Sequence, residues 1–358
     1  MTVNVSKPAL NVREKLAELD KPTGIAGEAM LRAETPQEQF NLIGAGRRNL
    51  IINGDFQVSQ RGDYSSATAI TNGSYYLDRF KLGLGTASTG TVQHTTETLP
   101  NNKTVKSLKI VSTATASSGY LAIRHVFEDF RLLSNQTITV SAWIKTNIAG
   151  YTFRHDSTTN FGDTFPATGN WEYVTATYTM PTITAAGSGA NQTTLAIINY
   201  TGSNGTGQNN GDYFQIAQVQ LELGKVATPF EHRSYGEELA LCQRFFWQIS
   251  GNASDQTTFG NGYSEDTDSA QVTLFFPVEM RDAPSTTISN NDVGESSVQI
   301  VGVGVAHNAS LNSILDPSRL SVRLRFNADS GTPFTAGHAI VGRLTNSTSA
   351  YIYVDAEL

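Results

Sequence analysis

Paired acidic residues are the first place to look for chemistry, because cleavage of a glycosidic bond uses two carboxyl groups that flank it. Glu128-Asp129 follows an expected strand, and Glu237-Glu238 stands where a helix is expected to begin and its dipole favours negative charge. A polar segment, residues 250–269, reads as a loop and contains Asp255, Glu265, Asp266 and Asp268. None of these groups has the pattern of a catalytic pair. We interpret the acids of the loop as solvated turn residues.

The sequence also contains no clear motif for a metal site or a catalytic nucleophile. The acidic loop could offer oxygen ligands to calcium, but it lacks the EF-hand spacing, and whether it binds a structural calcium stays open. Six scattered histidines give no paired zinc ligands: His94, His125, His155, His232, His307 and His338. The one cysteine, Cys242, lies among apolar residues, which favours a buried side chain over a nucleophile. We therefore expect no catalytic residue, no metal site, no cofactor and no enzymatic activity.

Aromatic side chains are better candidates, because sugar binding commonly stacks a ring on the apolar face of a pyranose. Four tyrosines have Gly, Ser or Asn close by, which suggests exposure, and they are the candidate ligand-binding residues: Tyr75, Tyr76, Tyr151 and Tyr263. Trp143 and Trp171 lie in or beside expected strands, where we expect them to belong to the core.

The elements that must position these residues are mostly strands. Runs rich in β-branched and aromatic residues, separated by Gly, Asn and Ser clusters, predict strands at 105–111, 121–127, 137–144, 173–179, 194–200 and 214–223. Ile138, Val140 and Ala142 alternate with polar residues, the period of a half-buried strand. Residues 185–192 and 202–212 read as Gly/Asn-rich loops. The spacing of these strands predicts a β-sandwich or jelly roll over residues 49–236.

The segment 213–247 closes this unit and opens another. Pro229 forces an extended backbone, and Ser234 with Glu237 three residues later has the spacing of a capping box, so a short apolar helix is expected to follow. Strands are then predicted at 270–276, 298–305, 320–326, 339–344 and 351–354. We expect residues 237–358 to form a second antiparallel β-sandwich, so that the segment acts as a hinge between two domains.

Residues 1–48 differ from the rest. Val12, Leu16 and Leu19 form a helical stripe, and Thr35-Pro36-Gln37-Glu38 combines a capping box with proline at the first helical position. Helices this short are marginal alone. We expect this N-terminal helical segment to form a threefold bundle or to dock on a larger assembly; a frayed terminus is the alternative.

Composition limits the class of protein. The chain has 358 residues, 39% hydrophobic and 16% charged, with a net charge of -7. This length predicts two or three folded domains. No basic excess exists for binding nucleic acid phosphates, and no run is long enough for membrane insertion. The N-terminus lacks the apolar region of a signal peptide, so we expect synthesis in a cytoplasm without export by such a peptide.

Several sequence segments resemble, in the same order along the chain, those of a known family. FQIAQVQLELGKVATPFEHRS at 214–234 resembles the end of a domain found in bacteriophage tail-fibre and other virion proteins, which is similar to jelly-roll carbohydrate-binding modules. NLIINGDFQVSQRG at 49–62, YYLDRF at 75–80, TITVSAWIKT at 137–146 and NWEYVTATYTMP at 170–181 resemble other strands of it. KPTGIAGEAMLRAETPQEQF at 21–40 resembles the N-terminal segment of marine phage fibre proteins.

The resemblance implies a non-enzymatic virion fibre, localised in the virion (tail fibre). It implies a homotrimer that contacts other tail or head proteins through residues 1–48 and binds a host surface glycan, with the C-terminal domain as the receptor-binding domain. A head fibre or decoration protein without a receptor role and a polysaccharide-degrading tailspike are the alternatives.

Overall fold

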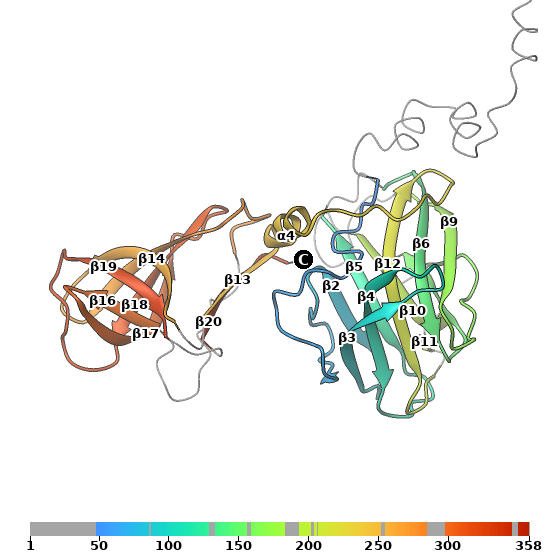
Figure 1. Cartoon of the computed structure of the whole chain (residues 1–358), viewed down its shortest axis with the longest axis horizontal. Coiled ribbons are helices and arrows are strands. Elements are labelled where there is room, and N and C mark those ends of the chain that lie inside the picture. The colour runs from blue at the N-terminus through green and yellow to red at the C-terminus, as the bar shows by residue number, and fades with distance from the viewer. Residues whose placement is uncertain are drawn as a thin grey trace, which may run out of the picture.

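The computed structural model describes residues 48–357, with gaps at 86, 129–132, 156–158, 183–192, 202–203, 206, 252–254, 285–297 and 346–349. The expected helices of the N-terminal segment and the expected loop at 185–192 lie outside the described residues. In the rest of the chain, the predicted fold class is confirmed: the structure is mainly β, with two antiparallel units joined by one short helix (Figure 1).

The first unit contains two antiparallel sheets that pack face to face. One sheet has the strand order β1-β3-β4-β12-β6-β9. Its strands are β1 (Thr68–Ala69), β3 (Gly90–Thr98), β4 (Thr104–Ser112), β12 (Tyr213–Leu223), β6 (Thr137–Thr146) and β9 (Glu172–Thr179). The other has the order β2-β5-β10-β7-β8, with β11 on β10. Its strands are β2 (Phe80–Leu84), β5 (Leu121–Phe127), β10 (Thr193–Thr201), β7 (Tyr151–His155), β8 (Thr159–Phe161) and β11 (Asn204–Gly205).

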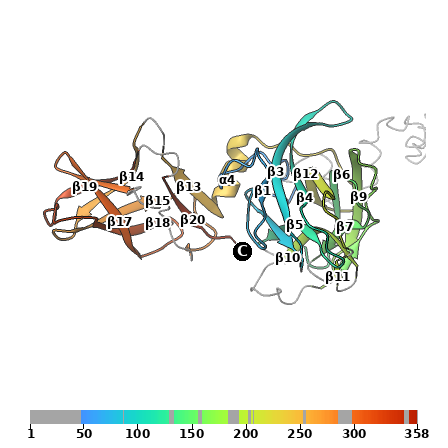
Figure 2. The ribbon, with the colours of Figure 1, turned by 90° about the horizontal axis from the view of Figure 1, so that it is seen from below.

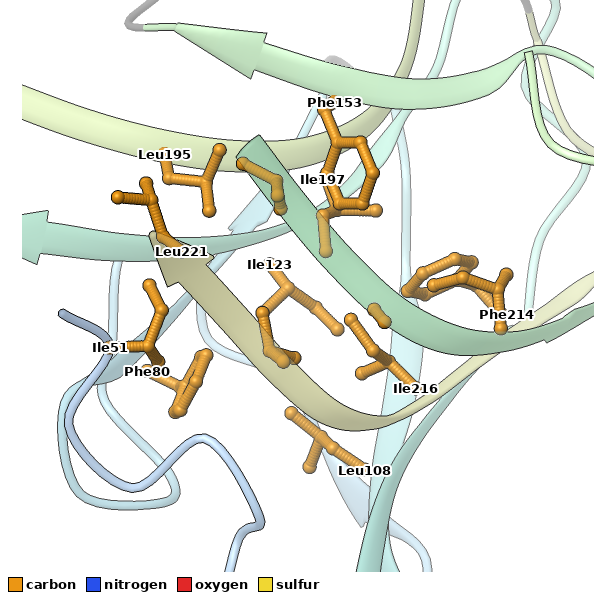
Figure 3. Close-up of a cluster of buried hydrophobic side chains, with 14 of the residues drawn as sticks. Ile51, Phe80, Leu108, Ile123, Phe153, Leu195, Ile197, Phe214, Ile216 and Leu221 are labelled. Atoms are coloured by element: carbon orange, nitrogen blue, oxygen red, sulfur yellow. The ribbon is translucent and has the colours of Figure 1, made fainter. Parts of the chain in front are cut away.

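The core of this unit lies between the two sheets. Strand alternation sends one set of side chains inward from each sheet, and Figure 3 shows Ile123, Phe153 and Ile197 from one sheet close to Ile216 and Leu221 from the other. All of these side chains are buried. Burying aliphatic and aromatic side chains of this size stabilises the fold by about 1.5–3 kcal/mol each, which explains why the β-branched and aromatic runs became strands.

Strand β12 is an interior strand of the sheet β1-β3-β4-β12-β6-β9. It pairs with β4 on one side and β6 on the other, and its register with β6 shifts between Ala217 and Gln220. Gln218 has a positive φ of 51° in this bulge. Gly54 approaches the bulge so closely that a Cβ there would lie 2.2 Å from the carbonyl oxygen of Val219. Gly54 is therefore required for the start of the chain to pass against β12.

Helix α4 (Tyr235–Gln243) follows, as predicted from its capping residues. Ser234 is the N-cap, and its hydroxyl accepts a hydrogen bond from the Glu237 amide at 3.3 Å. The helix ends at Gln243, and Phe246 already belongs to β13 (Phe246–Ser250), which pairs with β20 (Tyr351–Asp355).

The second unit is antiparallel, as expected, but it is a closed six-stranded barrel with the order β14-β15-β18-β17-β16-β19, whereas we expected a β-sandwich. Its strands are β14 (Thr257–Ser264), β15 (Ser269–Phe275), β16 (Val298–Gly302), β17 (Val305–Leu315), β18 (Ser321–Ala328) and β19 (Ala339–Leu344). The consecutive strands β14 and β15 pair so closely that a Cβ at Gly262 would lie 1.7 Å from the Gln271 carbonyl oxygen. The barrel has its own core, which includes Val272, Leu324 and Phe326.

Two expectations about this unit were wrong. The strand predicted at 298–305 is two strands, because the chain reverses at Val303 and Gly304, which have φ of 49° and 79°. The polar loop predicted at 250–269 contains β14, whose glycines and asparagine conceal the alternation of a strand.

Helix α4, β13 and the C-terminal end of the chain lie at the junction between the two units (Figures 1 and 2). The C-terminal end of the chain returns to it, where Glu357 forms ion pairs with Arg79 and Arg61 of the first unit. Arg281 and Arg61 add hydrogen bonds to Ala356 and Asp355. These contacts join the C-terminal end of the chain to the first unit.

Candidate functional site: the outer face of the six-stranded sheet

An aromatic pair lies on the sheet β1-β3-β4-β12-β6-β9, on the side that faces away from the core. Trp143 of β6 and Tyr173 of β9 are directly paired in the register, and their ring centroids are 5.4 Å apart. Trp143 is half-buried and Tyr173 is 46% exposed. Both rings point outward because their strand neighbours, such as Ala142 and Ile144, fill the core. The pair forms an accessible aromatic surface on the outer side of this sheet.

Polar side chains continue this surface toward β3. Gln215 of β12 is buried, and its Nε2 lies within hydrogen-bonding distance of Thr95 Oγ1 (2.9 Å), Glu97 Oε1 (3.0 Å) and Ser107 Oγ (2.9 Å). These contacts hold the half-buried Glu97 carboxylate in place at the surface. The arrangement gives a fixed hydrogen-bond acceptor on the same face as the rings.

Two lysines complete the face. Lys109 and Lys145 flank Gln215 in the register on β4 and β6, and both are half-buried. The Lys109 ammonium lies 5.3 Å from the ring centroid of Tyr213, within the range of a cation–π contact. We call Trp143, Tyr173, Glu97, Lys109 and Lys145 the sheet face. It presents two rings, one carboxylate and two ammonium groups over adjacent strands.

The far end of the same sheet surface is closed by the chain itself. Residues 225–231 cross it, and the Thr228 amide donates to Glu222 Oε2 at 3.0 Å while the Glu231 amide donates to Gln220 Oε1 at 2.8 Å. These hydrogen bonds satisfy polar side chains of β12 that would otherwise be buried without partners. Tyr173 of the sheet face remains 46% exposed beside this covered region.

The four predicted tyrosines are not brought together, and only one has the expected exposure. Tyr263 is 43% exposed on β14. Tyr75 is half-buried beside the junction, where the Arg61 guanidinium lies 5.1 Å from its ring centroid. Burial raises the pKa of its hydroxyl well above the ordinary value.

The expected exposure of Tyr76 and Tyr151 was wrong. Tyr76 is 7% exposed, and its hydroxyl donates to the Ala69 carbonyl at 2.8 Å. Tyr151 is 2% exposed, stacks on Phe214 at 4.5 Å, and has a pKa raised by burial. Neighbouring glycine and serine residues mark where the chain turns, but they do not show toward which side the ring points.

Trp143 was assigned to the core, although the sequence contained the signal to place it. Thr137, Thr139 and Ser141 alternate with the apolar residues of that strand, and position 143 continues the polar series. The structure places these residues on the outer side, so period-2 alternation alone would have identified the ring as a surface side chain.

Glu128 and Glu238, two of the acidic residues singled out in the sequence, have structural partners, whereas Asp129 lies outside the described residues. Glu128 forms an ion pair with Arg244 at 2.5 Å. Glu238 is buried, accepts a hydrogen bond from the Asn53 amide and pairs with Arg233 at 3.1 Å. Burial raises the pKa of Glu238 above its usual value. These groups tie segments together and form no pair across a surface.

The remaining reactive groups are inert or dispersed. Cys242 is buried, and burial raises the pKa of its thiol well above the ordinary value. Across the described ranges, no three His, Cys, Asp or Glu side chains gather as metal ligands would. No helix among the described residues has the length and apolar character to cross a bilayer.

Comparison with known proteins gives similarity to solved structures only. No family model matches the chain, and no curated protein matches it. A cyclase from Fischerella sp. TAU is 14% identical, with a TM-score of 0.34, and the match covers 51% of this chain and 99% of that one.

Two further solved structures are similar over nearly half the chain. The family 11 carbohydrate-binding module of a Clostridium thermocellum cellulase is 12% identical, with a TM-score of 0.26, covering 46% of this chain and 98% of that one. The enzymatically active domain of bacteriophage CBA120 tailspike protein 4 is 12% identical, with a TM-score of 0.27, covering 49% of this chain and 21% of that one. These likenesses are weak.

Proposed function

We propose that the protein is a non-enzymatic bacteriophage tail-fibre protein that attaches the virion to host surface glycans, with the sheet face as a glycan-binding site. The observation that carries the proposal is the pair of accessible rings, Trp143 and Tyr173, on the same side of the sheet as the fixed carboxylate of Glu97. A glycan offers an apolar ring face and hydroxyl groups at its edge. The two aromatic rings can stack on the apolar face of the sugar, and the carboxylate and the lysines can form hydrogen bonds with its hydroxyl groups.

The chemistry of the sheet face supports binding without reaction. Its acid, Glu97, lies on β3, whereas Trp143 lies on β6, and β4 and β12 stand between them. Strands lie about 4.8 Å apart, so Glu97 is about 14 Å from the aromatic pair across the sheet. A single carboxylate at that distance cannot supply both the acid and the nucleophile that flank a glycosidic bond.

Tail attachment, the trimer and the docking of residues 1–48 come from the family resemblance and belong to the same proposal. Three copies would raise the avidity of a weak site.

A glycan array with the full chain tests the binding site. Trp143→Ala together with Tyr173→Ala is expected to lower the affinity for the bound glycans by about tenfold or more, since truncating a central contact ring typically costs about 2 kcal/mol. Leu320→Ala is the matched control, because Leu320 is 60% exposed and lies on the barrel. A wild-type chain that binds no array glycan, or a double variant that binds equally well, would contradict the proposal. A reducing-sugar assay on the bound polysaccharides tests the enzymatic alternative, and no release of sugar is expected.

Light scattering tests the assembly. The full chain is expected to be a trimer, and a shortened chain beginning at Arg48 a monomer, because residues 1–47 contain the predicted helices. Trimers of both chains would place assembly in the β-units, and monomers of both would contradict the fibre.

A further inference from the structure

Two aromatic rings on the barrel are exposed on one side of its wall. Tyr263 of β14 is 43% exposed and Phe275 of β15 is 72% exposed. Tyr263 is the register partner of Gln271 on β15. Phe275 follows Gln271 by four residues on β15 and therefore points to the same outer side. At about 3.3 Å per residue, the two rings are about 13 Å apart along the strand. A single exposed ring would need no explanation, but two on one face with a defined spacing do.

Neither ring contributes to the barrel core. Ala270, Val272 and Leu274 of β15 point inward and are buried, so Gln271, Thr273 and Phe275 point outward. Tyr263 also keeps a fixed position, since its hydroxyl donates to Gln271 Oε1 at 3.1 Å. Both aromatic side chains are held on the surface by the strand register.

Two polar rows cross the wall: the first begins at Tyr263 itself, and the second lies between the levels of Tyr263 and Phe275. One row runs from Tyr263 through Gln271 to Arg325 of β18. The next runs from Asn261 through Thr273 to Arg323. Each row spans three adjacent strands and therefore about 10 Å. Amide, hydroxyl and guanidinium groups of this kind donate and accept the hydrogen bonds that sugar hydroxyls make.

The charges of this surface are paired within the protein. Arg325 lies 2.9 Å from Glu265 and 3.8 Å from Asp266, and Arg323 forms an ion pair with Asp316. An acidic saccharide would have to compete with these carboxylates for the arginines. The surface therefore suits an uncharged ligand.

We infer that this surface, which we call the barrel face (Tyr263, Phe275, Asn261, Gln271, Thr273, Arg323 and Arg325), is a second binding site that takes a neutral oligosaccharide. The inference rests on the proposed function in that both faces take glycans. The two rings bind sugar units at the ends of the site, and the polar rows bind the hydroxyl groups between them. The separation of the rings selects an oligosaccharide over a single sugar.

Titration calorimetry and a glycan array with the full chain test the inference, using neutral oligosaccharides and their uronic-acid or sulfated counterparts as probes. Tyr263→Ala with Phe275→Ala is expected to abolish, or to weaken by about tenfold or more, binding of a neutral oligosaccharide. The sheet-face double variant should retain that binding. Leu320→Ala serves as the control for an exposed apolar side chain on the barrel. Both barrel substitutions are at exposed positions, and an unchanged melting temperature confirms folding.

The outcomes separate this inference from the proposed function. Binding lost only in the barrel-face variant supports the barrel face and overturns the sheet face. Binding lost only in the sheet-face variant overturns the barrel face and leaves the proposed function intact. Two sets of glycans, each lost in one variant, support both sites, and a wild-type chain that binds no probe overturns both. Binding of acidic probes at the barrel face with equal strength would overturn the neutral class.

Discussion

Arg79 and Glu357 form a buried ion pair across the two units of the molecule. The two side chains are 1% and 4% exposed. The Arg79 guanidinium also stacks on the ring of Phe245 at 3.5 Å. Glu357 receives a second ion pair from Arg61 at 3.2 Å. Charges removed from water are tolerated only when they are paired and hydrogen-bonded, so these residues fix the position of the C-terminal end against the first unit.

Breaking this ion pair is expected to destabilise the whole molecule. Arg79→Ala leaves Glu357 buried with one partner fewer, which we expect to lower the free energy of unfolding by about 3–5 kcal/mol. Urea unfolding followed by fluorescence measures the change. Glu279→Gln is the control, because it removes an exposed ion pair with Arg319 and should cost less than about 1 kcal/mol. Equal effects of the two substitutions would contradict the role of the junction.

The stability of the protein should fall in mild acid because of His125. This imidazole is fully buried, its Nε2 accepts a hydrogen bond from the Ile52 amide at 3.3 Å, and burial holds its pKa well below 6.5. The unfolded chain binds the proton near pH 6.5 and the folded chain does not, so lowering the pH favours unfolding. From His125 alone we expect a loss of about 1.4 kcal/mol per pH unit below pH 6.5.

A variant isolates this effect from other titrating groups, such as His94, whose pKa burial also lowers. His125→Gln keeps a hydrogen-bond acceptor near Ile52 and removes the titrating group. Its unfolding free energy should vary less between pH 6.5 and 5 than that of the wild type. Parallel pH profiles for the two proteins would show that His125 has an ordinary pKa in the folded state.

Truncation of Tyr151 should destabilise the protein strongly, whereas truncation of Tyr173 should destabilise it only slightly. Tyr151→Ala empties a core position stacked on Phe214, and we expect a cost of about 3–5 kcal/mol. Tyr173→Ala removes a ring that is 46% exposed and should cost less than about 1 kcal/mol while weakening glycan binding. Thermal unfolding measures both. A large loss of stability in Tyr173→Ala would mean that the ring serves packing.

Val303 offers a site for stabilisation. It is 82% exposed and has φ of 49° in the tight turn between β16 and β17, where a β-branched residue is strained. Asn followed by Gly is preferred in such turns, and Gly304 is already present. Val303→Asn is therefore expected to raise stability by about 1 kcal/mol. An unchanged or lower melting temperature would contradict the strain.

The sequence was informative wherever apolar alternation was clear. The strand expected at 121–127 is β5, with both ends correct, because Leu, Ile, Val and Phe leave little choice of element. The helix start at Ser234 was recoverable because capping is a local interaction. Barrel closure was not, because it depends on contacts such as β14 with β19, whose residues are far apart in the chain.

The sites were harder to predict than the strands. Tyrosine exposure depends on which sheet covers a ring, and local glycine and serine content does not carry that information. Gln215 reads as one polar residue in an apolar run, yet it fixes Glu97 through a contact 118 positions away in the sequence. Trp143 was the exception, since its side of the strand could have been counted directly.

The two-stranded connection of β13 and β20 has a consequence for modular exchange. Ser250 and Tyr351 are register partners, so the chain enters and leaves the barrel at neighbouring points. An insertion whose ends meet in this way can be replaced by another compact domain without altering the path of its host. Grafting a different barrel between these two positions would leave the Arg79–Glu357 ion pair in place, but the graft would have to replace the hydrogen bond that Arg281 donates to the Ala356 carbonyl. The architecture thus allows one barrel to be exchanged for another through a single two-stranded attachment.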